Sequence, residues 1–253
     1  RGASSGRETR GADVAPTAWR PPLQTAGAVL SIVAGAYLIA ILTVSVGAGV
    51  LQSLGFVLSD PAPRAMRSAL QFIGFGVAIA AYLELRDDWE LIRWRVPGLR
   101  DLGWIVGGIV TLFGALYVLS VVASALGAST AESQIVTNGR QNPIYLLYLV
   151  PVTIFLVGPT EELIFRGIVQ GTIRRAYGPA VGVLGASIIF SAIHLPSLLG
   201  DGQFTTLAII FALGALLGGL YELTDNILVP IVVHGLYNAA QFVSQYATLT
   251  GMI

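Results

Sequence analysis

Seven long apolar stretches constrain this chain more than any other feature of its sequence. They lie at residues 27–51, 66–85, 103–126, 143–175, 179–195, 204–222 and 227–246. An α-helix needs about 17 to 25 such residues to cross a bilayer. Lipid offers backbone groups no hydrogen bonds, so such segments span the membrane as helices. We therefore predict an all-α, polytopic integral membrane protein of about seven transmembrane helices.

The composition agrees with a lipid-embedded fold and excludes several kinds of site. Of the 253 residues, 55% are hydrophobic and 11% are charged, whereas a soluble domain carries about 25% charged residues. There is no cysteine, which excludes thiol nucleophiles and thiolate metal ligands. The net charge is zero and no basic run occurs, so we expect membrane lipid and no nucleic acid as a partner.

Arginines near the predicted spans indicate the domain organisation and the orientation. Residues 1–22 are polar and lack an apolar core, so we expect a flexible cytoplasmic tail before a transmembrane helical domain at 23–253. Arginines recur in the 86–101 loop and at Arg174 and Arg175. Positive charge is retained on the cytoplasmic side. The pattern predicts a multi-pass cell-membrane protein with its N-terminus cytoplasmic and its C-terminus outside.

The fourth span contains an acidic pair and an arginine inside apolar sequence. Each such charge costs about 2.5 to 3.5 kcal/mol at a helix centre, so each needs a partner or a function. Glu162 and Arg166 are four residues apart and share one helix face, which predicts an ion pair. Glu161 is rotated about 100° away and is free to face a cavity. Pro159 precedes the pair, and we expect the helix to bend or break there.

Both histidines of the chain fall in later spans at a depth that matches Glu161. Glu161 lies 16 residues before Tyr177 and His194 lies 17 after it. An antiparallel hairpin that turns near Tyr177 brings both to about 25 Å from the turn. Phe190 is one turn before His194 and could wall the same cavity. His234 and Asn238 share one face of the last span at a compatible depth, which predicts a site among the last four spans.

A carboxylate and an imidazole that share a water can activate it for attack on a carbonyl carbon. In this interpretation Glu161 is the general base and His194 helps to hold the water. His234 and Asn238 stabilise the tetrahedral intermediate, and Glu162 with Arg166 supports the helix. Alternatively, Glu161, His194 and His234 supply a catalytic zinc site with an open position. The cofactor stays open, with zinc as one candidate.

These motifs carry a resemblance to a known family. Glu161-Glu162-x-x-x-Arg166, Phe190-x-x-x-His194 and His234-x-x-x-Asn238 resemble, in order and helix placement, the three motifs of the CAAX protease and bacteriocin-processing (CPBP, or Abi) family. The resemblance covers about residues 140–245. It implies an intramembrane endopeptidase of the metallo or glutamate type, similar to type II CAAX prenyl endopeptidases. The implied partner is a membrane-associated peptide or protein, with prenylation and the oligomeric state left open.

Other functions remain alternatives at this point. A noncatalytic immunity or scaffold protein could keep the same cluster for binding, and intramembrane Glu and His also form the proton relays of transporters. Gly214 and Gly218 have the spacing that lets helix backbones approach closely. We expect these two glycines to serve packing.

Overall fold

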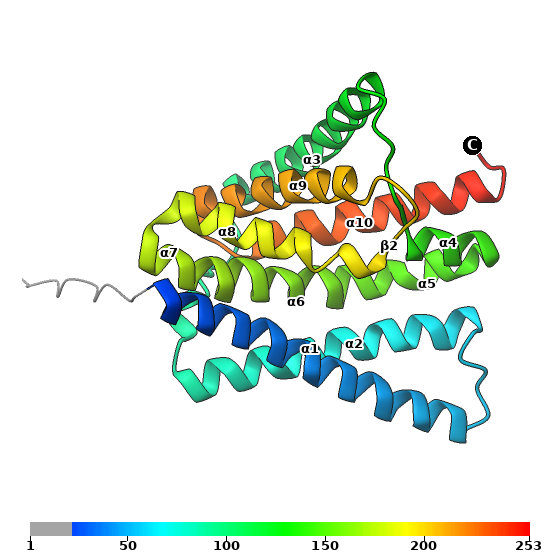
Figure 1. Ribbon diagram of the computed structural model, residues 1–253, viewed down its shortest axis with the longest axis horizontal. Coiled ribbons are helices and arrows are strands. Elements are labelled where there is room, and N and C mark those ends of the chain that lie inside the picture. Colours follow the sequence, from blue (N-terminus) through cyan, green and yellow to red (C-terminus); the bar gives the residue numbers. More distant parts are fainter. Residues whose placement is uncertain (1–21) are drawn as a thin grey trace, which may run out of the picture.

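The computed structural model describes residues 22–253 and is almost entirely helical (Figure 1). The tail predicted over residues 1–22 therefore lies outside the described residues, apart from Pro22, with which the first helix begins. The main helices are α1 (Pro22–Ser53), α2 (Pro61–Arg86), α3 (Leu99–Ala125), α4 (Gln134–Gln141), α5 (Ile144–Val152), α6 (Gly158–Glu162), α7 (Gly171–Tyr177), α8 (Pro179–Ala192), α9 (Gln203–Thr224) and α10 (Leu228–Leu249). Two short 3₁₀ turns, Trp89–Leu91 and Leu195–Ser197, lie in loops. Strands β1 (Glu132–Ser133) and β2 (Leu198–Leu199) pair antiparallel.

The described helices confirm the polytopic membrane architecture. Six of them are long and apolar enough to cross a membrane, including the continuous run Ile144–Tyr177. The seventh predicted span is present as α10, which is as long as α9 but less apolar because it carries His234, Asn238 and two glutamines. Large apolar side chains such as Val110 and Phe155 are mostly exposed on the outer faces, as a lipid-facing surface requires.

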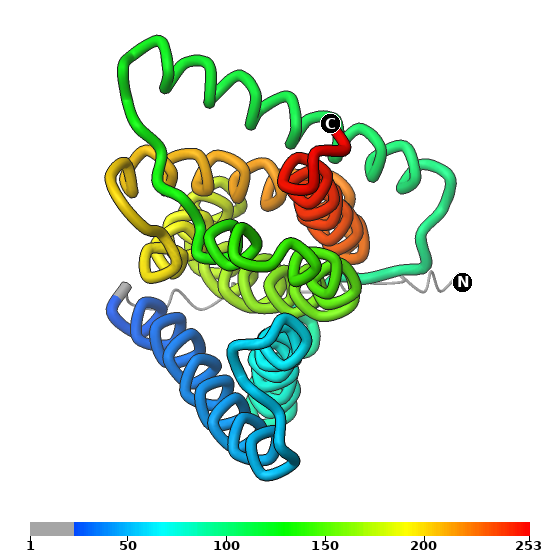
Figure 2. The backbone as a smooth tube through the Cα atoms, turned by 90° about the vertical axis from the view of Figure 1, so that its right-hand side faces the viewer, coloured from blue at the N-terminus to red at the C-terminus, as the bar shows by residue number. Residues whose placement is uncertain are grey.

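The helices form three layers (Figures 1 and 2). The α1–α2 pair packs against one side of the long helical run 144–177, which lies together with α8, α9 and α10 in the middle layer. Helix α3 covers the other side and contacts α9 and α10. The candidate site residues lie in the middle layer, shielded on both sides.

A bend or a break was expected at Pro159, and the break is absent because the helix is continuous there. Two π-helical segments, Thr153–Val157 and Leu163–Gln170, join α5, α6 and α7 into one run, the α5–α7 helix. The Gly158 amide donates to the Thr153 carbonyl, five residues back. The wider turn places Pro159 in the first turn of α6, where its missing amide hydrogen costs little.

Candidate active site

A close contact between two backbones brings the acidic pair to α10. A Cβ placed on Gly158 would lie 3.1 Å from the Gly235 Cα, so a side chain at this position would separate α6 from α10. Gly235 directly follows His234, and Gly158 is one turn before Glu162. The two glycines therefore set the distance between the acidic pair and the second histidine.

Glu162 is the centre of the cluster. Its Oε1 lies 3.2 Å from Nη1 of Arg166, so the ion pair expected from their spacing is present. The same oxygen lies 2.7 Å from Nδ1 of His234. Both Glu162 and Arg166 are at most 1% exposed, so each charge depends on its partner.

His234 lies between the two carboxylates. A carboxylate oxygen only accepts, so the bond to Glu162 places a hydrogen on Nδ1 of His234. The other ring nitrogen, Nε2, lies 3.7 Å from Oε2 of Glu161. Glu162 thus fixes the orientation of the ring, and Glu161 faces the nitrogen that remains for chemistry.

His194 lies in the turn that directly follows α8, which ends at Ala192. The apolar span Pro179–Ser197 includes this turn, as predicted for the fifth span. The residue before a proline avoids helical geometry, and Pro196 comes two residues after His194. Nδ1 of His194 lies 2.7 Å from the Phe190 carbonyl oxygen, which orients the ring and leaves Nε2 unused by this bond.

Phe190 connects the two histidines, as a wall of the site would. Its ring centroid lies 4.7 Å from that of His194 and 6.1 Å from that of His234. The Arg166 guanidinium stacks 4.4 Å from the same ring. The rings of both histidines therefore contact the ring of Phe190. Within residues 22–253 no hydrogen bond joins His194 to Glu161.

Asn238 follows His234 by one turn of α10 and is partly exposed. Within the described part of the chain its side chain makes no hydrogen bond that satisfies the geometric criteria. It lies on the same helix face as His234. Its amide is available for a ligand.

A row of polar side chains between the α5–α7 helix and α9 was not predicted from the sequence. Arg166 donates to the Gly214 carbonyl at 3.0 Å and Gln170 to the Gly218 carbonyl at 3.2 Å. Gln170 also donates to Glu222 at 2.8 Å. The sequence did contain a signal for this row. Four-residue spacing relates Glu162, Arg166, Gln170 and Arg174, and the same spacing relates Gly214, Gly218 and Glu222 on α9.

The glycines of α9 pack closely against neighbouring helices. A Cβ on Gly214 would lie 3.1 Å from the Phe190 ring and 3.4 Å from the Arg166 guanidinium, and one on Gly218 would lie 2.7 Å from the Gln170 amide oxygen. The two glycines therefore make room for side chains of α8 and of the α5–α7 helix.

The zinc hypothesis finds no gathered ligand set. Among residues 22–253 no group of three His, Cys, Asp or Glu side chains has the geometry to hold a metal ion. Nδ1 of His194 is engaged by the Phe190 carbonyl, and Nδ1 of His234 is engaged by Glu162. As arranged among the described residues, these side chains do not fit a three-ligand zinc site.

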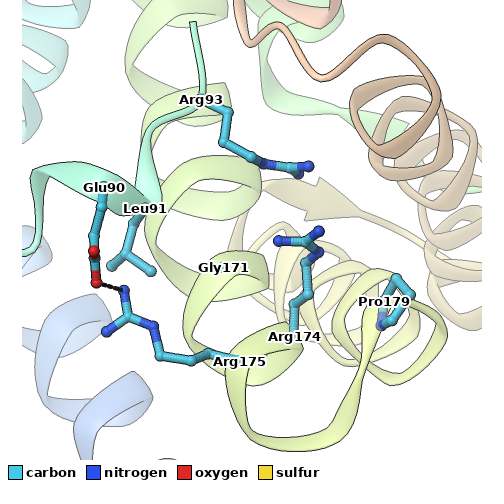
Figure 3. Close-up of a pocket in the computed structure, with 7 residues that line it drawn as sticks. All are labelled: Glu90, Leu91, Arg93, Gly171, Arg174, Arg175 and Pro179. Atoms are coloured by element: carbon cyan, nitrogen blue, oxygen red, sulfur yellow. Dashed lines mark ion pairs between the residues drawn. The ribbon is translucent and has the colours of Figure 1, made fainter. Parts of the chain in front are cut away.

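A cavity of about 430 Å³ lies at the α7–α8 end of the molecule, away from the acidic pair (Figure 3). Arg93 and Arg174 extend into it toward each other, and both are paired with Glu222. Gly171 in its wall is ten residues from Glu161, about 15 Å along the helix. This cavity is therefore separate from the candidate active site.

Comparison with known proteins identifies the region that contains these residues. Residues 143–240 match the model of a family described as type II CAAX prenyl endopeptidase Rce1-like. The chain is also similar to the uncharacterized protein YpbD of Bacillus subtilis (strain 168), with 25% identity over 167 residues, 65% of this chain and 80% of that protein. No solved structure matches the chain significantly. The segment of this multi-pass membrane protein that resembles the Rce1-like endopeptidase family thus contains the acidic pair, both histidines and Asn238.

Proposed function

We propose that this protein is an intramembrane endopeptidase that hydrolyses a peptide bond with a water activated by Glu161. The observation that carries the proposal is the buried contact of His234 with both Glu161 and Glu162. Glu161 lies near the middle of the α5–α7 helix, about 24 Å from its end at Tyr177. A carboxylate at that depth needs a function or a full set of partners.

In the proposed reaction Glu161 is the general base. It takes a proton from the water while the water oxygen bonds to the scissile carbonyl carbon, and it later returns that proton to the leaving amine. His194 supports the water through Nε2, because Nδ1 is already bonded to the Phe190 carbonyl.

His234 and Asn238 stabilise the oxyanion in this proposal. Two carboxylates flank the His234 ring, so a protonated ring is paired on both sides and its Nε2–H can donate to the developing negative charge. The Asn238 amide supplies a second donor one turn further along α10. Glu162 and Arg166 hold the ring in position.

The substrate class we propose is a membrane-associated peptide, of which a prenylated CAAX peptide is the first to test. Purified protein in detergent is given a quenched fluorescent prenylated CAAX peptide, and cleavage is compared for wild type, Glu161→Ala and His194→Ala. We expect each variant to lose at least about a hundredfold in rate. Glu132→Ala, which removes a carboxylate of the β1–β2 region, is the matched control and should retain the wild-type rate.

Three outcomes would redirect the proposal. A Glu161→Ala protein that cleaves at the wild-type rate would exclude Glu161 as the base. A folded wild-type protein that cleaves neither prenylated nor unprenylated peptides would favour the noncatalytic module. Loss of activity with a chelator, restored by a divalent metal, would favour the metallo type over the glutamate type.

A further inference from the structure

The cavity of Figure 3 is lined mainly by guanidinium groups. Arg93 reaches it from the α2–α3 loop, and Arg174 and Arg175 reach it from α7. Glu90 is the one carboxylate in its wall among the described residues. The volume of about 430 Å³ lies in the range of small-ligand pockets. Because guanidinium groups bind phosphate through paired N–H donors, the cavity has the size and the donors to hold a phosphate group.

Arg174 is the arginine with unused donors. Its Nε lies 3.0 Å from Oε2 of Glu222. Within residues 22–253 neither of its two terminal nitrogens takes part in a hydrogen bond or an ion pair. Its side chain is 42% exposed, so these nitrogens are open to a ligand in the cavity. Together they can bind two oxygens of one phosphate.

The carboxylates near Arg93 and Arg174 leave positive charge on the cavity side. The two arginines share the single carboxylate of Glu222, which is not part of the cavity wall. Asp225 also pairs with Arg93, but its side chain is 69% exposed, so water screens its charge. A phosphate between the two guanidinium groups therefore balances charge that Glu222 has to divide between them.

The rest of the wall adds a smaller attraction for an anion. Arg175 is already paired with Asp88 and Glu90 through its two terminal nitrogens, so it offers few free donors. Pro179 begins α8, and among the described residues no side chain caps the N-terminus of this helix. The partial positive charge of a helix N-terminus favours an anion. The arrangement therefore favours a phosphate beside Arg174 over one beside Arg175.

The position of the cavity points to a phospholipid as the source of the phosphate. Trp89 and Trp94 lie next to its lining residues in the sequence and are 49% and 67% exposed. Tryptophan is enriched where a membrane meets water, at the level of the lipid headgroups. Leu85 and Leu99, at the ends of the helices that this loop joins, also have mostly exposed side chains that lipid chains can cover. A lipid at this surface has its phosphate at the level of the cavity.

We propose that this cavity binds the phosphate of a phospholipid headgroup, with the two terminal nitrogens of Arg174 as its main donors. Arg93 supplies the facing positive charge, and Glu222 competes with the phosphate for both arginines. The site is separate from the one proposed for peptide cleavage, and no bond is made or broken in it. Lipid binding is therefore independent of the endopeptidase function.

The test is isothermal titration calorimetry of the delipidated protein, in an uncharged detergent, with dioctanoyl phosphatidylglycerol. Wild type should bind this lipid saturably. Dioctanoylglycerol, which has the same chains but no phosphate, should bind at least about tenfold more weakly. Arg174→Gln should raise the Kd for the phospholipid at least about tenfold, because it removes the charged donors. Arg140→Gln, which alters a 60% exposed arginine at the far end of the molecule (Figure 1), is the matched control and should leave Kd unchanged.

A variant with the opposite expected effect separates phosphate binding from damage to the fold. Glu222→Gln removes the competing charge and keeps an acceptor oxygen for Gln170 and the arginines, so it should lower Kd about threefold. A wild-type Kd in Arg174→Gln, weaker binding in Glu222→Gln, or equally tight binding of dioctanoylglycerol would overturn the proposal. Inorganic phosphate that binds as tightly as the phospholipid would identify a soluble phosphate as the ligand and overturn the lipid source.

Discussion

At the scale of single residues, Glu162 joins the acidic pair to both Arg166 and His234. One of its oxygens lies within bonding distance of both Arg166 and His234, and none of the three side chains is more than 7% exposed. Its other oxygen has no hydrogen-bond partner within residues 22–253. Arg166 and His234 therefore both interact with the same oxygen of the Glu162 carboxylate. The loss of either partner leaves the buried charge of Glu162 with less compensation.

Replacement of Arg166 should destabilise the protein strongly. We expect Arg166→Ala to cost about 3 to 5 kcal/mol, because it leaves the Glu162 charge buried with one partner fewer. The measurement is thermal unfolding in detergent. Arg140→Ala is the control, since Arg140 is 60% exposed in its ion pair with Glu132 and should change stability by less than about 1 kcal/mol. Equal losses in the two variants would contradict this account of Glu162.

At the scale of helices, the contact between the α5–α7 helix and α9 depends on a row of polar side chains. Gln170 is fully buried and bridges the Gly218 carbonyl and Glu222, which also pairs with Arg93 and Arg174. The row begins at the candidate site and ends at the cavity of Figure 3. Such bonds join helices where apolar side chains alone give little preference for one register.

A methyl group on Gly218 should disrupt this row. Because its Cβ would lie 2.7 Å from the Gln170 amide oxygen, we expect Gly218→Ala to destabilise the protein by about 1 to 3 kcal/mol in thermal unfolding. Gly219→Ala is the neighbouring control, since a Cβ there would meet nothing within 4 Å. In a Gln170→Ala background the Gly218→Ala penalty should shrink. If Gly218→Ala costs as much stability in the Gln170→Ala background, the cause is displacement of the backbone and not the contact with Gln170.

At the scale of the whole molecule, the orientation in the membrane is still a prediction. The loop between α2 and α3 and the turn between α7 and α8 contain arginines and lie at the same end in Figure 1. Those ends should be cytoplasmic, and the α1–α2 loop and the residues after β2 should face outward.

The lack of native cysteine allows this orientation to be tested directly. Single cysteines at the exposed positions Ser59, Val96 and Asp201 are treated in intact cells with a membrane-impermeant maleimide. We expect Ser59→Cys and Asp201→Cys to react, and Val96→Cys to react only after the membrane is permeabilised. The reverse pattern would place the N-terminus outside.

The sequence by itself determined the features that depend on local chemistry. Apolar runs predicted the helices because burial in lipid is decided segment by segment. The Glu162–Arg166 pair was predictable because residues four apart meet on any helix. The three motifs also located the family-matched segment, since their order in the chain is a property of sequence.

Only the tertiary structure decided which distant groups meet. The bond of Glu162 to His234 and the bond of Gln170 to the Gly218 carbonyl each join elements that lie far apart in sequence. Helix periodicity gives the face of a residue but not the neighbour across it, which depends on how the helices cross. The continuity of the helix through Pro159 was also visible only in the structure, because it depends on the π-turn in which the Gly158 amide donates to the Thr153 carbonyl.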